Sequence, residues 1–317
     1  MILPITQSKE WYKLQNDLGE ETFFEETDSY YFLAINKHTP VGNYLFLPYG
    51  PVAKDEKGFS KSISRLTELA KSKHAIFIRI EPQDPEFINL FPPKTIKSKE
   101  INPADTWILS LKPSREELIL GFSHGVRNPY NTARKRGLIV ETTKDPAAIS
   151  HLVKLQHALA RERHINTYSE SYLKAELSQP FATLYLVKYQ KPADIERTPD
   201  LPADGQILAA SLFFDYKGTR YYMQSAADSR YKKLPATVAL LATAVIDAKE
   251  QGNKYFDFWG IAPDGADSSH PWYGFTKFKK SFGGQAVHYA GTHDIILKPF
   301  RYRIYQSIRI FGKILHH

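Results

Sequence analysis

The pattern of apolar and polar residues along the chain predicts strands that alternate with helices. The clearest helix covers residues 235–251, where apolar residues recur at helical spacing between a proline and Gly252. The segments before and after it are rich in aromatic residues, which is typical of strands. The same order of strand, charged loop, helix and strand is predicted earlier, over residues 43–52, 60–73 and 75–82. We therefore expect one α/β unit to occur twice, the alternative being chance similarity between unrelated units.

Further predicted elements fill in the two halves of the chain. Strands are predicted over residues 106–111, 138–141, 183–189 and 206–216, and helices over residues 114–122, 127–137, 145–163 and 169–177. Residues 275–284 are expected to continue a strand. This alternation favours an α/β (α+β) fold in which mixed sheets are flanked by helices and a domain of acyltransferase size occurs twice.

Composition and charge narrow the class of protein. The 317-residue chain has no cysteine, which excludes disulfides, thiolate metal sites and a cysteine nucleophile. Its formal charge of +8 favours anionic partners such as nucleic acid, phosphorylated substrates or an acidic membrane surface. The sequence contains no secretory signal and no apolar run of about 20 residues, so we expect a cytoplasmic protein. It also lacks histidine pairs with metal-ligand spacing and a nucleophile elbow, which disfavours metal-dependent and serine hydrolases.

Two basic segments are candidates for contact with an anion. Arg230, Lys232 and Lys233 precede the helix at 235–251, where acetyl-coenzyme A enzymes have a glycine-rich turn; this turn lacks glycine, and Pro235 removes an amide donor. The loop therefore suits the phosphates of a tRNA acceptor end better than coenzyme A, the alternative being an ordinary basic loop. A helix near residue 300 alternates arginines with apolar residues. It is expected either to dock on an anionic membrane surface or to pack on the first domain.

Three stretches resemble the FemABX family, whose members transfer amino acids from aminoacyl-tRNA to the stem peptide of peptidoglycan precursors. The most specific is Asp-Phe-Trp-Gly at residues 257–260, followed by Phe-Lys-x-x-Phe-Gly-Gly at residues 278–284. Residues 127–141 and 47–52 are also similar to family segments. The resemblance implies two GNAT-like domains, the first at residues 1–111 completed by a helix at 294–317 and the second at 112–293. The chain has no room for the helical arm of longer members.

The resemblance also implies a catalytic centre. Lys279 aligns with the family's lysine near the reacting centre, where its ammonium would stabilise an oxyanion beside the apolar wall of Phe278. The alternative is that Lys277, Lys279 and Lys280 form a solvated strand face. Gly283 would permit close approach of the backbone, or form an ordinary turn. Glu81 would orient or deprotonate the attacking amine, the alternative being a charge that caps a strand end.

The same resemblance implies residues that bind the acceptor. Lys13 lies in the N-terminal helix that contributes to a diphosphate site, although Gln15 is an alternative at that position. Tyr172 matches a tyrosine of the precursor pocket. Arg163 is our choice for the family's arginine before it, with Tyr168 nearest the expected position.

The function implied is an aminoacyltransferase that transfers an amino acid from aminoacyl-tRNA to the amine of a stem peptide, with no cofactor besides this co-substrate. The expected partners are aminoacyl-tRNA, a UDP-linked or lipid-linked muropeptide and, at most, peripheral contact with the inner membrane surface. Two alternatives are a GNAT-like N-acyltransferase acting on another amine, in a polysaccharide or lipid, and a non-catalytic scaffold that binds precursor or nucleic acid.

Overall fold

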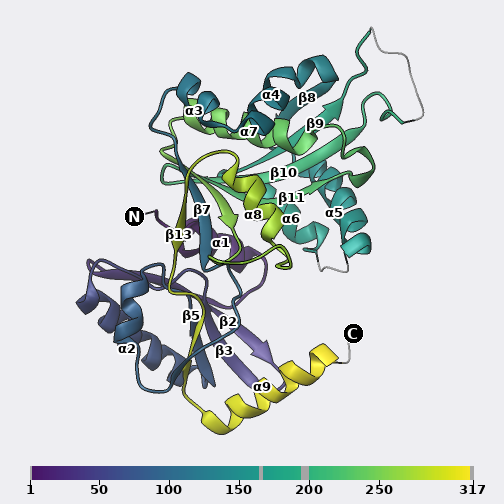
Figure 1. Ribbon diagram of the computed structural model, residues 1–317. Helices are drawn as coiled ribbons and strands as arrows, with labels where there is room; N and C mark the ends of the chain where they lie inside the picture. The colour runs from purple at the N-terminus through teal and green to yellow at the C-terminus, as the bar shows by residue number, and fades with distance from the viewer. Residues whose placement is uncertain (1, 164–166, 194–199, 315–317) are drawn as a thin grey trace. The chain divides into compact units, whose positions relative to one another are not determined.

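The computed structural model describes residues 2–163, 167–193 and 200–314, except for the side chains of residue 163 and of residues 310–314. The chain divides into two compact units (Figure 1). Apart from the first two residues, one unit contains Leu3–Ala104 and the segment that starts at His288, and the other contains Asp105–Val287. The division falls before strand β7 (Asp105–Ser110) rather than after it, because β7 pairs with β12 (Tyr255–Gly260) in the sheet of the second unit.

The first unit is a mixed sheet in the order β1-β2-β3-β5-β14-β6, with β4 paired to β2. Strands β3 and β5 run parallel, and the other described pairs are antiparallel. The elements are α1 (Lys9–Asp17), β1 (Thr22–Glu26), β2 (Tyr30–Thr39), β3 (Gly42–Leu47), β4 (Val52–Ala53), α2 (Glu56–Ser72), β5 (Phe77–Ile80), β6 (Thr95–Lys97), β14 (His293–Ile296) and α9 (Pro299–Ile314).

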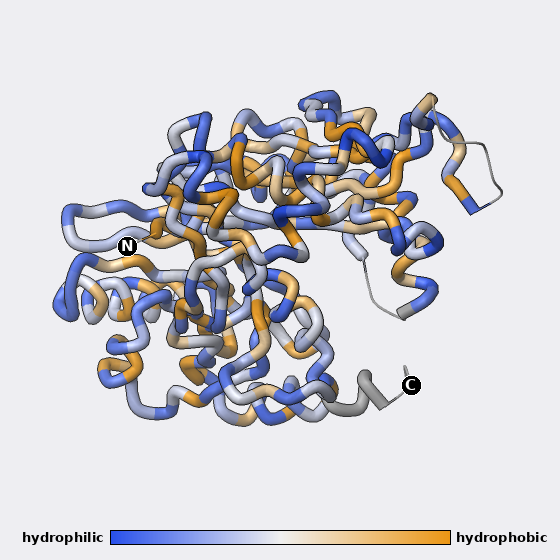
Figure 2. The backbone as a smooth tube through the Cα atoms, turned by 45° about the horizontal axis from the view of Figure 1, so that its top comes forward, coloured by the Kyte–Doolittle hydropathy of each residue, from blue (hydrophilic) through white to orange (hydrophobic). Residues whose placement is uncertain are grey.

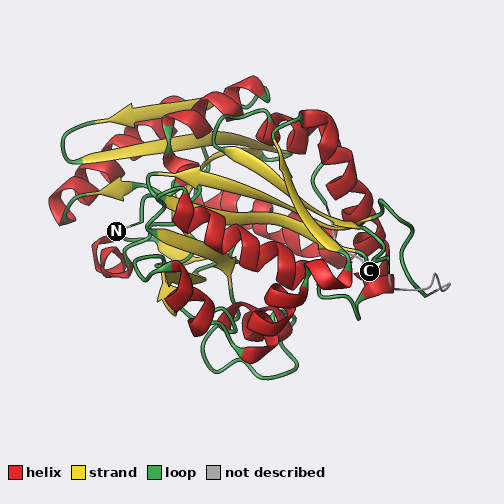
Figure 3. Ribbon diagram, turned by 90° about the horizontal axis from the view of Figure 1, so that it is seen from above, coloured by secondary structure: helices red, strands yellow, loops and turns green. Residues whose placement is uncertain are grey.

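The second unit is a mixed sheet in the order β13-β7-β12-β11-β10-β9-β8. Figure 1 shows α3, α4 and α7 on one side of this sheet and α5 and α6 on the other, and Figure 3 shows helices packed along its strands. Besides β7 and β12, the elements are α3 (Arg115–Gly121), α4 (His124–Thr132), β8 (Leu138–Thr143), α5 (Ile149–Arg163), α6 (Glu170–Leu177), β9 (Ala182–Tyr189), β10 (Ile207–Tyr216), β11 (Thr219–Ala227), α7 (Ala236–Glu250), α8 (Tyr273–Lys280) and β13 (Gln285–His288).

The repeated unit predicted from the sequence is present in both sheets. In the first unit α2 connects the parallel strands β3 and β5, and in the second α7 connects the parallel strands β11 and β12. Parallel neighbours require such a crossover, which is usually a helix. In each sheet an antiparallel strand then extends the pair, β14 beside β5 and β7 beside β12. The α/β fold with mixed sheets flanked by helices is therefore confirmed.

The cores follow from the apolar residues of these elements. Helix α2 places Phe59, Ile63 and Leu66 on the first sheet, one turn apart, as its amphipathic sequence predicts. Helix α7 is apolar on nearly all sides and is rich in alanine, which favours helix and allows close packing on the strands. Figure 2 shows hydrophobic stretches alternating with hydrophilic ones along the backbone.

Two expectations about local structure are wrong. Residues 275–284 do not continue a strand: α8 ends at Lys280, and β13 begins only at Gln285. The helix expected over residues 127–137 ends at Thr132, and Arg134–Arg136 form a separate 3-10 turn that stops at Gly137, whose φ is +74°. The inward face of α8 consists of the polar residues Thr276 and Lys279, so the apolar pattern does not indicate a helix there. After Thr132 the chain tightens into the 3-10 turn, which the left-handed conformation of Gly137 ends.

Candidate active site

Helix α8 brings Lys279 into the interior of the second unit. Thr276 and Lys279, one turn apart, are the buried residues of this helix, and only 9% of Lys279 is exposed. The Thr276 hydroxyl accepts a hydrogen bond of 2.8 Å from the backbone N–H of Ala262, which fixes the helix against the segment after β12. Lys277 and Lys280 are exposed, and Lys280 lies 5.3 Å from the centre of the Trp107 ring. The three lysines therefore do not form one solvated face.

The Lys279 ammonium is held against backbone. Its Nζ donates a hydrogen bond of 2.5 Å to the carbonyl oxygen of Gly260. An ammonium has three N–H donors, and the Gly260 carbonyl accepts one of them. Burial lowers the pKa of Lys279 to about 8, although the nearby Asp257 charge favours the protonated form. A buried amine with such a pKa is typical of functional sites.

Asp257 is the buried acid beside this ammonium. Its carboxylate accepts hydrogen bonds from the Thr106 hydroxyl and, at 2.8 Å, from the backbone N–H of Trp259. Burial raises the pKa of Asp257 to about 6, while these donors and Lys279 oppose the rise. Both side chains are therefore mainly charged at neutral pH. We did not predict Asp257 as a site residue; the signal was a carboxylate inside the apolar strand of the Asp-Phe-Trp-Gly motif.

An irregularity in β12 aims the Gly260 carbonyl at Lys279. The register between β12 and β7 shifts between Asp257 and Gly260, and Trp259 has a φ of +65°, a left-handed conformation that is rare for a bulky residue. Backbone strain of this kind concentrates at functional sites. The hydrogen bond from the Trp259 N–H to Asp257 stabilises the turn.

The C-terminal end of α8 is held in place by contacts of Phe278, Gly283 and Gly284. Phe278 is half-buried and packs edge-on against the buried ring of Phe282, with ring centres 5.3 Å apart. The Gly283 carbonyl accepts a 2.7 Å hydrogen bond from the Trp107 indole. Gly284 has a φ of +102°, and a Cβ there would lie 2.5 Å from the Ile108 carbonyl oxygen. Gly284 thus allows close approach to the backbone of β7, whereas a Cβ at Gly283 would make only ordinary contacts.

Three exposed aromatic residues at the start of α8 were also not predicted. Trp272, Tyr273 and Phe275 are each at least 40% exposed; Trp272 caps the N-terminus of α8, and the other two lie in its first turn. Large aromatic rings at the surface beside a basic segment are suited to stacking on nucleic-acid bases. The signal in the sequence was the spacing of aromatic residues in the loop before the three lysines.

Glu81 lies in the first unit, where its carboxylate is buried and hydrogen-bonded. The residue follows β5, is 2% exposed and accepts hydrogen bonds of 2.7 Å from the Asn102 amide and 2.6 Å from the Thr292 hydroxyl. Burial raises the pKa of Glu81, and these donors offset part of the rise. This geometry fixes the segment around Asn102 and the entry into β14, and it suits a positioning role better than that of a general base.

The predicted acceptor-binding residues are placed on separate helices. Lys13 is exposed on α1 in the first unit, whereas the alternative residue, Gln15, is buried. Tyr172 lies on α6 in the second unit and stacks on Tyr168, with ring centres 4.9 Å apart. Arg163 ends α5, and its side chain lies outside the described residues.

The basic loop predicted to contact tRNA connects β11 to α7, at the carboxyl end of a parallel strand. Lys232 and Lys233 are exposed. The Arg230 guanidinium is paired with Asp228, with Nε 2.9 Å from Oδ1 and Nη2 2.6 Å from Oδ2. The two lysines are therefore the more available cations of the loop.

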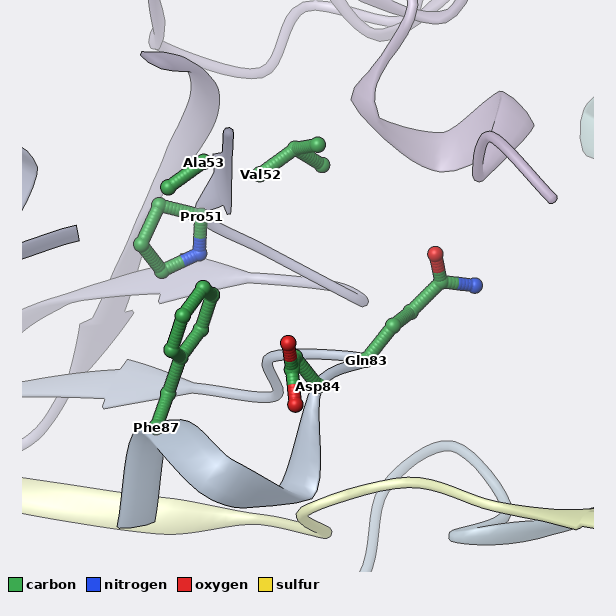
Figure 4. Close-up of a pocket in the computed structure, with 6 residues that line it drawn as sticks. All are labelled: Pro51, Val52, Ala53, Gln83, Asp84 and Phe87. Carbon is green, nitrogen blue, oxygen red and sulfur yellow. The ribbon is translucent and has the colours of Figure 1, made fainter. Parts of the chain in front are cut away.

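A small pocket in the first unit contains none of these residues. Pro51, Val52, Ala53, Gln83, Asp84 and Phe87 line it (Figure 4). Three or more His, Asp or Glu side chains that could hold a metal ion do not come together anywhere in the described ranges. None of the described helices has the length and hydrophobicity needed to cross a bilayer.

The segment that contains Asp257, Lys279 and Gly284 lies within a match to a known protein family. Residues 191–309 match the FemAB family. The resemblance predicted from the sequence is thereby confirmed over the part of the chain that contains the buried lysine. No curated protein matches the sequence.

Solved structures share the fold. A crystal structure of FemX matches with a TM-score of 0.80 and 19% identity, over 95% of this chain and 94% of that chain. L-PGS from Bacillus licheniformis matches with a TM-score of 0.61 and 13% identity, over 99% of each chain. A tandem GNAT protein from the clavulanic acid biosynthesis pathway matches with a TM-score of 0.53 and 12% identity, over 87% of this chain and 83% of that chain. The predicted pair of GNAT-like domains is confirmed as a fold.

Proposed function

We propose that the protein is an aminoacyltransferase that moves an amino acid from aminoacyl-tRNA to the stem-peptide amine of a peptidoglycan precursor. The observation that carries the proposal is the buried Lys279 ammonium, which the Gly260 carbonyl holds in place inside the FemAB-matching segment. The fold shared with FemX supports the same activity.

The proposed reaction converts an ester into an amide. The neutral amine of the acceptor attacks the ester carbonyl carbon, the new C–N bond forms, and the carbonyl oxygen becomes an oxyanion. Lys279 donates a hydrogen bond to this oxyanion, which is worth most in a water-poor site. Collapse of the intermediate breaks the bond to the ribose oxygen. The proton lost by the amine goes to this oxygen, so the products are the amide and tRNA with a free hydroxyl.

Asp257 keeps the ammonium charged at working pH. Its charge raises the pKa of Lys279 against the effect of burial. Because Asp257 is only 2% exposed and its Oδ1 already accepts hydrogen bonds from Thr106 and Trp259, this residue acts through Lys279 rather than on the substrate. General base remains the alternative role of Glu81, but the hydrogen bonds that its carboxylate accepts from Asn102 and Thr292 favour a positioning role.

The remaining predicted residues divide between the two substrates. Lys232, Lys233 and Arg230 contact the phosphates of the tRNA acceptor end, with Trp272, Tyr273 and Phe275 as stacking surfaces for its bases. Lys13, Arg163 and Tyr172 bind the muropeptide, through charge at its diphosphate and through aromatic contact.

The identity of the acyl donor is tested by supplying two acyl sources in separate incubations. Purified protein is incubated with a UDP-linked muropeptide and either charged tRNA or acetyl-coenzyme A, and the amide product is followed by mass. We expect transfer from charged tRNA and none from coenzyme A. Transfer from coenzyme A alone would overturn the proposal in favour of an N-acetyltransferase, and tight binding of muropeptide without turnover from either donor would indicate a scaffold.

A further inference from the structure

Helix α9 has an exposed apolar stripe. Phe300, Ile304 and Ile308 are 76%, 37% and 44% exposed. They are four residues apart, and because an α-helix has about 3.6 residues per turn, they lie along one face. Apolar residues in such a row seldom remain in water without a partner.

The opposite face of α9 is anchored to the first unit. Tyr302 is 4% exposed, packs edge-on against Phe77 and donates a 2.7 Å hydrogen bond to Asp294. Arg79 donates to the Tyr305 hydroxyl and pairs with Asp294 through two hydrogen bonds of 2.7 Å. The stripe faces solvent because the other face of α9 is fixed on the first unit.

Positive charge surrounds the stripe. Arg301 and Arg303 are exposed on its two sides, and neither pairs with an acidic side chain among the described residues. From residue 295 onward the sequence has lysines and arginines but no Asp or Glu. A helix with an apolar face and flanking basic residues lies in the interface of an anionic bilayer, with the apolar face in the acyl region.

We propose that α9 docks the protein on an anionic lipid surface through Phe300, Ile304 and Ile308. A second copy fits less well, because pairing two such faces would bring their arginines together. RNA also fits less well, because its phosphates attract the arginines but provide no apolar surface against which the two isoleucines could be buried. The inference does not rest on aminoacyl transfer, since lipid binding is measured without substrates.

The first test is sedimentation of the full chain with vesicles of phosphatidylcholine, with and without phosphatidylglycerol. We expect salt-sensitive binding only when phosphatidylglycerol is present. Replacing Phe300, Ile304 and Ile308 together with serine should weaken binding at least about tenfold, and Arg301→Gln should weaken it about fivefold. Leu120→Ser is the matched control, because Leu120 is 68% exposed on α3 and should not affect binding.

A second measurement does not depend on disrupting the helix. Because the chain has no cysteine, Ile304→Cys and Leu120→Cys each provide a single site for an environment-sensitive dye. We expect a blue shift at position 304 and none at 120 when anionic vesicles are added. Absence of vesicle binding at low salt, an unshifted dye at 304, or a serine variant that loses binding to tRNA but not to vesicles would each overturn the proposal.

Discussion

The Lys279 ammonium donates a hydrogen bond of 2.5 Å to the carbonyl oxygen of Gly260, the residue that ends β12. This contact connects α8, a helix that the apolar pattern does not indicate, to β12, a strand with a strained turn at Trp259. It places a positive charge where burial removes most of its hydration, and nearby Asp257 helps to maintain that charge.

The rate of transfer should depend on pH through Lys279. We expect kcat/KM to fall above about pH 8, as Lys279 loses its proton and with it the charge that stabilises the oxyanion. Asp257→Asn removes a charge that raises the pKa of Lys279, so the alkaline limb should move to lower pH. A pH profile of both proteins checks this, and an unmoved alkaline limb in the variant would contradict the coupling.

Gly284→Ala should destabilise the protein. The φ of +102° is rare for a residue with a side chain, and the added Cβ would lie 2.5 Å from the Ile108 carbonyl oxygen. We expect a loss of about 2–4 kcal/mol in the free energy of unfolding, measured by denaturant titration. Gly274→Ala is the matched control: it lies in α8 with nothing within 4 Å of the added Cβ, so it should gain up to about 1 kcal/mol. Equal stability of the two variants would contradict this account of the glycine.

Glu81 should act through structure rather than by proton transfer. Glu81→Gln keeps an acceptor for the Asn102 amide or the Thr292 hydroxyl, so we expect turnover within a few-fold of wild type. Glu81→Leu leaves both donors without their acceptor in the interior and should lose about 1–3 kcal/mol of stability. If Glu81→Gln instead abolished turnover while its melting temperature stayed normal, Glu81 would be the base.

Glu176 should make stability decrease with rising pH. It is fully buried on α6, and no donor among the described residues meets hydrogen-bond geometry at either carboxylate oxygen. Burial raises the pKa of Glu176 to about 8, and the nearby Tyr172 and Gln224 offset only part of this rise. The folded state therefore retains a proton that the unfolded state loses between about pH 4.5 and 8, and stability falls over that range.

Glu176→Gln removes this dependence. The difference in the free energy of unfolding between Glu176→Gln and wild type should grow from near zero at pH 4.5 to a few kcal/mol at pH 8 and above. This magnitude follows from about 1.4 kcal/mol for each unit by which the pKa is raised. Glu170→Gln is the control, because Glu170 is exposed on the same helix and pairs with Lys174. Parallel pH curves for wild type and Glu176→Gln would contradict the assignment.

The repeated fold could be predicted because its signals are local. The crossover helices α2 and α7 have clear apolar patterns, and their flanking strands are rich in aromatic and β-branched residues. The place of β7 could not be predicted, because strand composition does not specify the pairing partner: β7 follows the first unit in sequence but pairs with β12.

The candidate site could be predicted only in part. Lys279 was found through its motif, but the helix that buries it was missed because its inward face is Thr276 and Lys279, polar residues that a pattern assigns to solvent. The pKa values of Asp257 and Glu81 depend on burial and on hydrogen-bond donors that are distant in the sequence. The Thr106 donor is 151 residues from Asp257, and the Thr292 donor is 211 residues from Glu81.

The most direct test of the central claim is the single-turnover rate of amide formation from charged tRNA in Lys279→Met, at saturating muropeptide. We predict a fall of at least about 100-fold, as for loss of an oxyanion donor, with an unchanged or higher melting temperature because a buried charge is removed. Lys277→Met, on the exposed side of the same helix, should retain the wild-type rate. A Lys279→Met protein that is folded and transfers at the wild-type rate would contradict the account.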